Sequence, residues 1–330
     1  MVRFWHDDLL SAETACPMVA STTFSRVDLI DIMDSYSLGE YRSARPISAG
    51  TVQTNYIVET TQGAFVLKYY ENRSYESVQF EADVVRHIHA QGFPCAAIFP
   101  NQVGEYVNRH QQKPYMLFEF VEGEPVDAFN PHQLTQVTQL AARLQTLTEG
   151  FRPATTPHRW NYTPELCLRL AHQKAHELDS EMGYAKLRWY EREMAHLELP
   201  DALPRGICHA DFDVSNVLFN GDAVAALLDF DDANYTYLTF DLIALVDGNA
   251  WPFGEAFNPA HARDIVQDYR AVRPLSDLEQ AHLFDVHKLQ IFIDGIWFYA
   301  RGEVADFYEK QKVAFLDQFG RDAYSTALFS

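Results

Sequence analysis

The 330-residue chain has few basic residues and no long apolar run. Lys and Arg together number 26 against 46 Asp and Glu, which gives a formal net charge of −20. Nucleic acids are bound by clustered Lys and Arg, so this balance argues against a nucleic-acid partner and equally against an anionic membrane surface. Because no stretch of 18 apolar residues occurs, the sequence predicts no transmembrane helix.

Cysteine is also scarce. The four cysteines have neither zinc-ligand nor redox spacing (Cys16, Cys95, Cys167 and Cys208). The first ten residues turn acidic at once, unlike a signal peptide. We therefore expect reduced, structural cysteines in a cytoplasmic protein. Apolar residues still make up 47% of the chain, enough for a large core in two lobes or one large domain.

The order of strand and helix signals divides the chain in two. Five segments precede residue 124: a helix at 27–36, a β-hairpin of strands 54–61 and 63–70, a helix at 75–90 and a buried strand at 114–123. Gly123 and Pro125 then predict a hinge, and a mostly helical pattern follows from residue 131. We expect an N-terminal extension (1–26), a small β-rich N-lobe (27–122) and a larger helical C-lobe (123–330). The oligomeric state is not indicated.

The stretch HADFDVSNVLFNGDAVAALLDFDDA, residues 209–233, surrounds two apolar segments with carboxylates. Asn-Gly between the segments is typical of a tight β-hairpin turn. Folding the chain there brings Asn216 and Asp229 to the open end, with Asp211 in the loop leading in. Carboxylate and amide oxygens are a ligand set that suits Mg²⁺. In the alternative interpretation Asp211 and Asn216 are turn caps and the later aspartates are solvated.

The same residues resemble a known catalytic core. His209-Ala210-Asp211, followed by Asn216 and then Asp229-Phe230-Asp231, is similar to the core of the kinase-like small-molecule phosphotransferases, with Ala210 in place of the usual glycine. That group includes aminoglycoside phosphotransferases, choline kinases and bacterial homoserine kinases of this fold. The resemblance covers about residues 27 to 250. It implies an α+β, bilobal protein-kinase-like fold with a small β-rich N-lobe and a larger, mostly helical C-lobe.

The resemblance also implies roles for these residues. Asp211 would accept or orient the proton of the substrate hydroxyl, and Asn216 and Asp229 would hold Mg²⁺ on the phosphates of ATP. His209 would be structural, packing against the loop and hydrogen-bonding it. The expected cofactors are therefore ATP and Mg²⁺.

Two charged residues of the N-lobe lie on apolar faces. Lys68 is inside an apolar strand, and Glu81 lies on the apolar stripe of the following helix, between Val78 and Val85. A charged group on a buried face needs a partner. Their order resembles the kinase Lys–Glu ion pair that positions the nucleotide phosphates, so both are predicted nucleotide-binding residues. The alternative is two unrelated surface charges.

Two further segments are expected to contact the nucleotide. SAGTVQTN precedes the hairpin in the position of a phosphate-covering loop and includes Ser48, Gly50 and Thr51, although its single glycine does not make a glycine-rich motif. Glu119 and Val121 fall where the hinge backbone would hydrogen-bond adenine in the family that the chain resembles.

The substrate is expected to be a small molecule. Only nine residues separate Asp231 from Asp241, which leaves no room for the activation segment of a protein kinase. Asp241 opens the next helix and is interpreted as a structural first-turn carboxylate. Asp213, Asp231 and Asp232 add acidity that suits an amine-bearing alcohol, such as homoserine, an amino alcohol or an aminoglycoside. Each of the three can equally be a solvated loop residue.

The leading hypothesis is thus an ATP-dependent kinase of a small-molecule hydroxyl. A non-catalytic nucleotide-binding module of the same fold is the first alternative, and a Ser/Thr protein kinase is a minor variant. A metal-dependent hydrolase using His209, Asp211 and Asp213 is the third hypothesis, although no second histidine cluster accompanies it.

Overall fold

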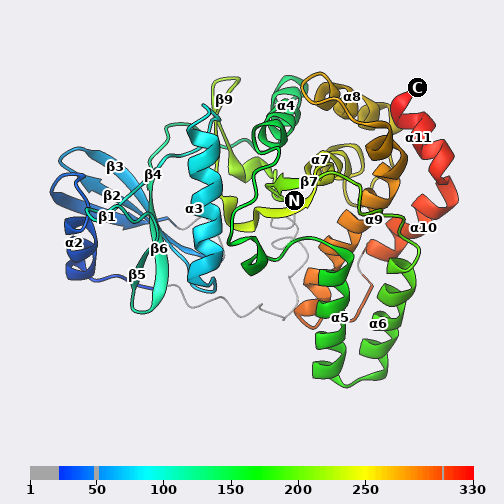
Figure 1. Cartoon of the computed structure of the whole chain (residues 1–330), viewed down its shortest axis with the longest axis horizontal. Coiled ribbons are helices and arrows are strands. Elements are labelled where there is room, and N and C mark those ends of the chain that lie inside the picture. The colour runs from blue at the N-terminus through cyan, green and yellow to red at the C-terminus, as the bar shows by residue number, and fades with distance from the viewer. Residues whose placement is uncertain (1–21, 48–51, 307) are drawn as a thin grey trace.

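The N-terminal part of the chain folds as an antiparallel sheet with one helix on each side (Figure 1). The computed structural model describes residues 22–47, 52–306 and 308–330. The strands of this sheet are β1 (Tyr41–Pro46), β2 (Thr54–Thr60), β3 (Gly63–Tyr69), β4 (Ile98–Phe99), β5 (Asn108–His110) and β6 (Lys113–Glu119). They lie in the order β1-β2-β3-β6-β4, with β5 also paired to β6. The hairpin predicted from residues 54–70 is confirmed, with Thr60 opposite Gly63 at its turn.

Side chains of β3 alternate between the two helices. Leu67 and Tyr69 join the apolar cluster that includes α2 (Arg26–Asp34), and Tyr70 joins the cluster that includes α3 (Tyr75–His89). Because successive strand residues point to opposite faces, Lys68 lies on the α3 side of the sheet. Ser25 caps α2, and Phe24 is buried against the sheet. Residues 24 and 25, which fall in the predicted N-terminal extension, thus already contact the N-lobe. The predicted division of the chain into residues 1–26, 27–122 and 123–330 stays a prediction.

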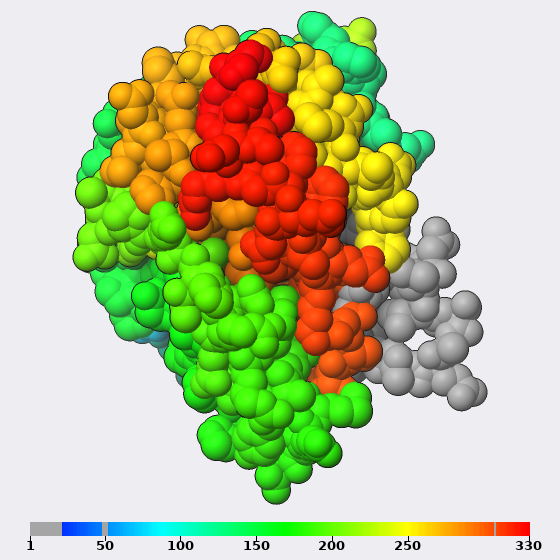
Figure 2. Space-filling view, turned by 90° about the vertical axis from the view of Figure 1, so that its right-hand side faces the viewer, coloured from blue at the N-terminus to red at the C-terminus, as the bar shows by residue number. Residues whose placement is uncertain are grey.

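A linker leads from β6 into the helical part. Its helices are α4 (Pro131–Leu147), α5 (Pro164–Leu178), α6 (Glu181–Met194), α7 (Phe240–Ala250), α8 (Pro259–Arg270), α9 (Asp277–Ala300), α10 (Glu309–Phe319) and α11 (Arg321–Phe329). In Figure 1, α5 and α6 lie side by side and α9 runs next to α5. Figure 2 shows α10 and α11, drawn in red, crossing the face of the molecule opposite the sheet. The bilobal architecture expected from the sequence is confirmed.

Two short strand pairs lie where the sheet meets the helices. One pairs β7 (Arg205–Cys208) with β10 (Asn234–Tyr237), and the other pairs β8 (Val217–Asn220) with β9 (Ala223–Leu227). The predicted β8–β9 hairpin is present, and its register sets Val217 opposite Leu227 and Asn220 opposite Ala223, so Gly221 and Asp222 form the turn in place of Asn220-Gly221. None of the helices in the described ranges is long and apolar enough to cross a membrane.

Candidate active site

Lys68 joins the two lobes by its side chain. Its Nζ atom lies 3.1 Å from Oε1 of Glu81 on α3 and 2.8 Å from Oδ1 of Asp229, which follows β9. All three come from different elements, and Lys68 and Glu81 are buried. The two carboxylates keep the pKa of Lys68 raised although burial opposes this, so its ammonium stays charged. The Lys68–Glu81 ion pair predicted from the sequence is confirmed, and the alternative of two unrelated surface charges is wrong.

The loop between β7 and β8 is held in place by a carboxylate beneath it. Asp241, the second residue of α7, accepts hydrogen bonds from the backbone N–H groups of His209 at 2.9 Å and Ala210 at 2.8 Å. Gln145 on α4 donates a third bond at 3.1 Å. Burial raises the pKa of Asp241, and these donors oppose the rise. The structural role expected for Asp241 is confirmed: its carboxylate holds the backbone of the loop between β7 and β8.

His209 is fully buried, with both ring nitrogens in use. Its Nε2 lies 2.9 Å from the carbonyl oxygen of Leu228, and its Nδ1 accepts from the N–H of Asp211 at 3.3 Å. Burial lowers the pKa of the imidazole, so it is neutral at physiological pH. His209 thus ties the loop to the end of β9, and its nitrogens are not available to a metal in the manner that the hydrolase hypothesis requires.

Ala210, directly before Asp211, has an unusual backbone conformation. Its φ of 64° lies in the left-handed region, which costs a residue with a Cβ about 1–2 kcal/mol. Asn216 then fixes the next residue: its side-chain nitrogen donates to Oδ2 of Asp211 at 2.7 Å and to the backbone oxygen of Asp211 at 3.0 Å. The structure therefore brings Asp211 and Asn216 together, five residues apart in sequence.

Asn216 and Asp229 lie at the same end of the β8–β9 hairpin, as predicted. The N–H of Leu228 donates to the carbonyl oxygen of Asn216 at 2.8 Å, so the two chain segments are adjacent. Because the amide nitrogen of Asn216 is committed to Asp211, its Oδ1 is the atom that remains for a cation. Asp229 also has a left-handed backbone, with φ 59°, and its side chain is 27% exposed.

An amide oxygen beside a partly exposed carboxylate fits Mg²⁺, which takes one or two protein oxygens together with phosphates and water. Among the described residues, no group of three or more His, Cys, Asp or Glu side chains is placed to hold a metal ion. The donor set is thus suited to a metal that arrives with its own oxygen ligands.

Asp231 and Asp232 share one arginine. Arg73, in the loop between β3 and α3, donates to Asp231 through Nε at 2.9 Å and to Asp232 through Nη2 at 2.7 Å. Asp231 is buried and also accepts from Gln53 at 2.9 Å, so its charge is compensated inside the protein. The side chain of Asp232 is 41% exposed, and burial together with the charge of Asp231 raises its pKa. As substrate ligands, both remain predictions.

Two functional arginines gave no signal in the sequence. Arg73 reaches Asp231 across 158 residues, and Arg159 is a buried loop residue that donates to the backbone oxygens of Asp231 and of Ala233. Arg159 also donates to Ser77 Oγ on α3 at 2.7 Å. Neither lies in a periodic segment, and their partners are distant in sequence. Together they fasten the segment after Asp229 to the N-lobe.

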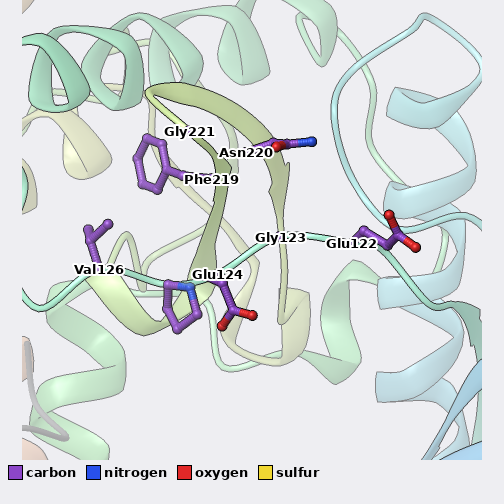
Figure 3. Close-up of a pocket in the computed structure, with 8 residues that line it drawn as sticks. Glu122, Gly123, Glu124, Val126, Phe219, Asn220 and Gly221 are labelled. Carbon is purple, nitrogen blue, oxygen red and sulfur yellow. The ribbon is translucent and has the colours of Figure 1, made fainter.

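The linker between the lobes is bonded to the β8–β9 hairpin. Glu124 and Phe219 exchange two backbone hydrogen bonds of 3.0 and 2.9 Å, and a Cβ on Gly123 would lie 3.1 Å from that of Leu218. Figure 3 shows this crossing, where a hollow of about 350 Å³ is lined by residues 122–126 and 219–221. Glu119 ends β6 just before it, and its N–H donates to Ala97 at 2.8 Å.

The remaining predicted site residues are placed as follows. Val121 lies in the linker, where its hinge role stays a prediction. Asp213 caps a short 3₁₀ turn by accepting from the N–H of Ser215 at 3.0 Å. Ser48, Gly50 and Thr51 lie outside the described residues.

The fold and this site define a class of protein. Residues 43–275 match the model of the phosphotransferase enzyme family, and the chain belongs to that family. It is therefore an ATP-dependent enzyme of the small-molecule kinase class, as the catalytic stretch indicated. Within the class, the chain is 31% identical over 277 residues to a homoserine kinase of Afipia carboxidovorans, covering 81% of each chain. A homoserine kinase of Nitrobacter winogradskyi is 29% identical over the same share of both chains.

Solved structures agree on the fold. An amicoumacin kinase, determined with AMP-PNP, Ca²⁺ and Ami, superposes with a TM-score of 0.63 at 15% identity, covering 91% of this chain and 94% of that one. A microcompartment-associated aminopropanol kinase gives a TM-score of 0.54 at 16% identity, over 92% and 95% of the two chains. At these identities the likeness concerns the fold alone.

Proposed function

We propose that this chain transfers the terminal phosphoryl group of Mg²⁺-ATP to the hydroxyl of a small, amine-bearing alcohol, with homoserine as the first candidate. The observation that carries the proposal is the pairing of Asp211 with Asn216 at 2.7 Å on a loop that is hydrogen-bonded to Leu228, next to Asp229. A carboxylate fixed in this way is placed to serve a hydroxyl nucleophile. The similarity to curated homoserine kinases, which extends over most of the chain, supports homoserine among the possible alcohols.

The residues divide the work of phosphoryl transfer. Asp211 accepts or orients the proton of the attacking hydroxyl, and the charged ammonium of Lys68 binds the nucleotide phosphates. Oδ1 of Asn216 and the carboxylate of Asp229 would hold Mg²⁺, and bound Mg²⁺ would neutralise part of the phosphate charge. In the same proposal, the backbone of Glu119 and Val121 receives adenine, and Ser48, Gly50 and Thr51 lie over the phosphates. The cytoplasmic location expected from the sequence stays a prediction.

An ADP-release screen tests this function. The panel consists of homoserine, choline, ethanolamine, other amino alcohols, methylthioribose and aminoglycosides, and we expect turnover with an amine-bearing member. Asp211→Asn should lower kcat by about 10²–10⁴-fold, the usual share of a positioned acid–base group. Asp222→Asn, in the exposed turn of the same hairpin, is the matched control and should keep the wild-type rate.

Three results would count against the proposal or a part of it. Binding of Mg²⁺-ATP without turnover of any panel member would favour the non-catalytic module. Phosphorylation of a Ser or Thr peptide in preference to every small alcohol would favour the protein-kinase variant. An unchanged kcat in Asp211→Asn would remove that residue from its role.

A further inference from the structure

Helix α9 has a polar pair on an otherwise apolar segment. Gln290 and Asp294 are one turn apart, and the Nε2 of Gln290 donates to Oδ2 of Asp294 at 2.7 Å. The hydroxyl of Tyr308 donates to the same carboxylate oxygen at 3.1 Å. Asp294 is only partly buried, while the residues around it on α9 are mostly buried. The pair is thus a polar site that solvent can reach at one side of an apolar helix.

An acceptor in this pair lacks a donor. Gln290 is 5% exposed, and its Oε1 has no hydrogen-bond partner in the described part of the chain. Buried side-chain oxygens nearly always have a donor, so one without a donor marks a place where a ligand group fits. Because its sister atom Nε2 is bonded to Asp294, this oxygen lies beside the carboxylate. Both groups are acceptors, and together they call for a ligand with several N–H or O–H donors.

The charges around Asp294 leave it without a cation. Burial raises the pKa of Asp294 to about 6, and the carboxylate of Asp247 on α7 adds to the rise. The nearest ammonium, Lys312 on α10, is bonded to both oxygens of Asp247 at 2.8 and 2.7 Å and to the backbone of Trp251. His287 on α9 also lies against Asp247, at 3.2 Å. Within the described residues, Asp294 makes no salt bridge.

An aromatic path leads from this pair to the catalytic loop. Trp297, three residues after Asp294 and so on the same side of α9, has its ring 5.0 Å from that of Trp160 and 6.3 Å from that of Tyr162. Trp160, which is 46% exposed, lies under the guanidinium of Arg73. Burial raises the pKa of the Tyr162 hydroxyl, and the nearby charges of Asp232 and Asp211 contribute. The pair is therefore connected through these rings to Arg73 and Tyr162, on the C-lobe side of the site.

We propose that the Asp294 carboxylate and the amide oxygen of Gln290 bind the ammonium group of the substrate and so direct its hydroxyl toward Asp211. This inference rests on the proposed function. An ammonium carries three donors, enough for both acceptors and for the neighbouring aromatic face or a water molecule. An alcohol without the amine leaves the two acceptors unpaired, so the pair discriminates against it.

The test compares two substrates in two proteins. Homoserine and 4-hydroxybutyrate, which differ by the amine, are each assayed with the wild type and with Asp294→Asn. We expect the KM for homoserine to rise about 10- to 100-fold in the variant, the usual loss when a hydrogen bond to a charged group is removed. The KM values for 4-hydroxybutyrate and for ATP should stay within about 2-fold. Asp306→Asn, in an exposed pair with Lys310, is the control and should change none of these three KM values.

Gln290→Met provides a second variant that keeps the carboxylate. It removes the amide oxygen, so it should raise the KM for homoserine in the same selective way. A pH series adds an independent readout. In the wild type the KM for homoserine should rise as the pH falls through about 6, because Asp294 becomes protonated, and in Asp294→Asn this dependence should be absent. Thermal melting of each variant checks that it is folded.

The outcomes separate this inference from the proposed function. If the wild type phosphorylates homoserine and Asp294→Asn has the same KM for it, the ammonium site is refuted while the function stands. If the screen identifies another amine-bearing alcohol, that alcohol and its deaminated counterpart replace the pair of substrates and the same comparison decides. If only amine-free alcohols are phosphorylated, the amine-bearing substrate class and the ammonium site are both refuted.

Discussion

The variant Asp241→Asn tests how much the support of the catalytic loop contributes, because Asp241 holds the loop and has no proposed role in the reaction itself. The carboxylate of Asp241 accepts two backbone N–H groups, from His209 and Ala210, and one side-chain N–H, from Gln145. An amide of the same shape has one acceptor oxygen, so its NH₂ group faces a buried N–H donor. An unsatisfied buried donor costs about 1–3 kcal/mol, and the remaining bonds lose the strength that charge gives them. We expect the variant to lose about 2–4 kcal/mol of unfolding free energy, from a total of about 5–15.

The effect on catalysis should be similar in free energy to the effect on folding. Ala210 precedes Asp211, and a shift of about 1 Å in a catalytic group can cost about 10²-fold in rate. Urea unfolding followed by tryptophan fluorescence gives the stability, and kcat is measured below the unfolding transition. Asp268→Asn keeps one acceptor oxygen for the single bond that Asp268 accepts from Thr135 on α4, and it serves as the control. If Asp241→Asn unfolds at the wild-type urea concentration and keeps the wild-type kcat, the two backbone bonds do not hold the loop.

Two further changes follow from the same region. Arg73→Met leaves Asp231 buried without its main cation and should cost about 3–5 kcal/mol at pH 7. Burial disfavours the Asp231 charge, but Arg73 holds its pKa well below the ordinary value, so this contribution is present above about pH 4 and is lost on acidification. The difference between variant and wild type in urea unfolding should therefore shrink as the pH falls below about 4, and a difference that stays constant there would contradict the assignment. Ala210→Gly removes the cost of a left-handed backbone, about 1–2 kcal/mol, which stabilises the protein. The greater entropy of glycine in the unfolded chain destabilises it by about 0.4–1 kcal/mol, so the melting temperature should rise slightly. A lower melting temperature would show that the Cβ of Ala210 makes a net favourable contact.

Local signals predicted much of the site. Strands rich in β-branched, aromatic and other apolar residues, joined at Gln-Gly in one case and near Asn-Gly in the other, were enough for the two hairpins, because these signals act over a few residues. Lys68 and Glu81 could be paired from the sequence because each lies on a face that the fold must bury. The roles of Asp211, Asn216 and Asp229 came from resemblance, and the structure adds how Asn216 fixes Asp211.

Contacts between distant segments could not be predicted in this way. Arg73 and Asp231 are far apart in sequence and lie outside periodic elements, so nothing local marks them as partners. Asp231 and Asp232 are neighbours with the same side chain, yet one is buried and the other is only partly buried. The polar pair on α9 did leave a trace, since Gln290 and Asp294 interrupt an apolar run at helical spacing, but only the tertiary structure shows the unpaired oxygen between them.

The attachment of the β8–β9 hairpin has a mechanical consequence. Backbone hydrogen bonds join it to Pro94, after α3, and to Glu124 in the linker, while the contacts of Lys68 with Asp229 and of Arg73 with Asp231 are made by side chains. The backbone bonds keep these segments close to the hairpin, whereas the side-chain pairs can part more easily. If the lobes separate, we therefore expect the opening to occur at the contacts of Lys68 and Arg73, while Pro94 and Glu124 stay close to the hairpin.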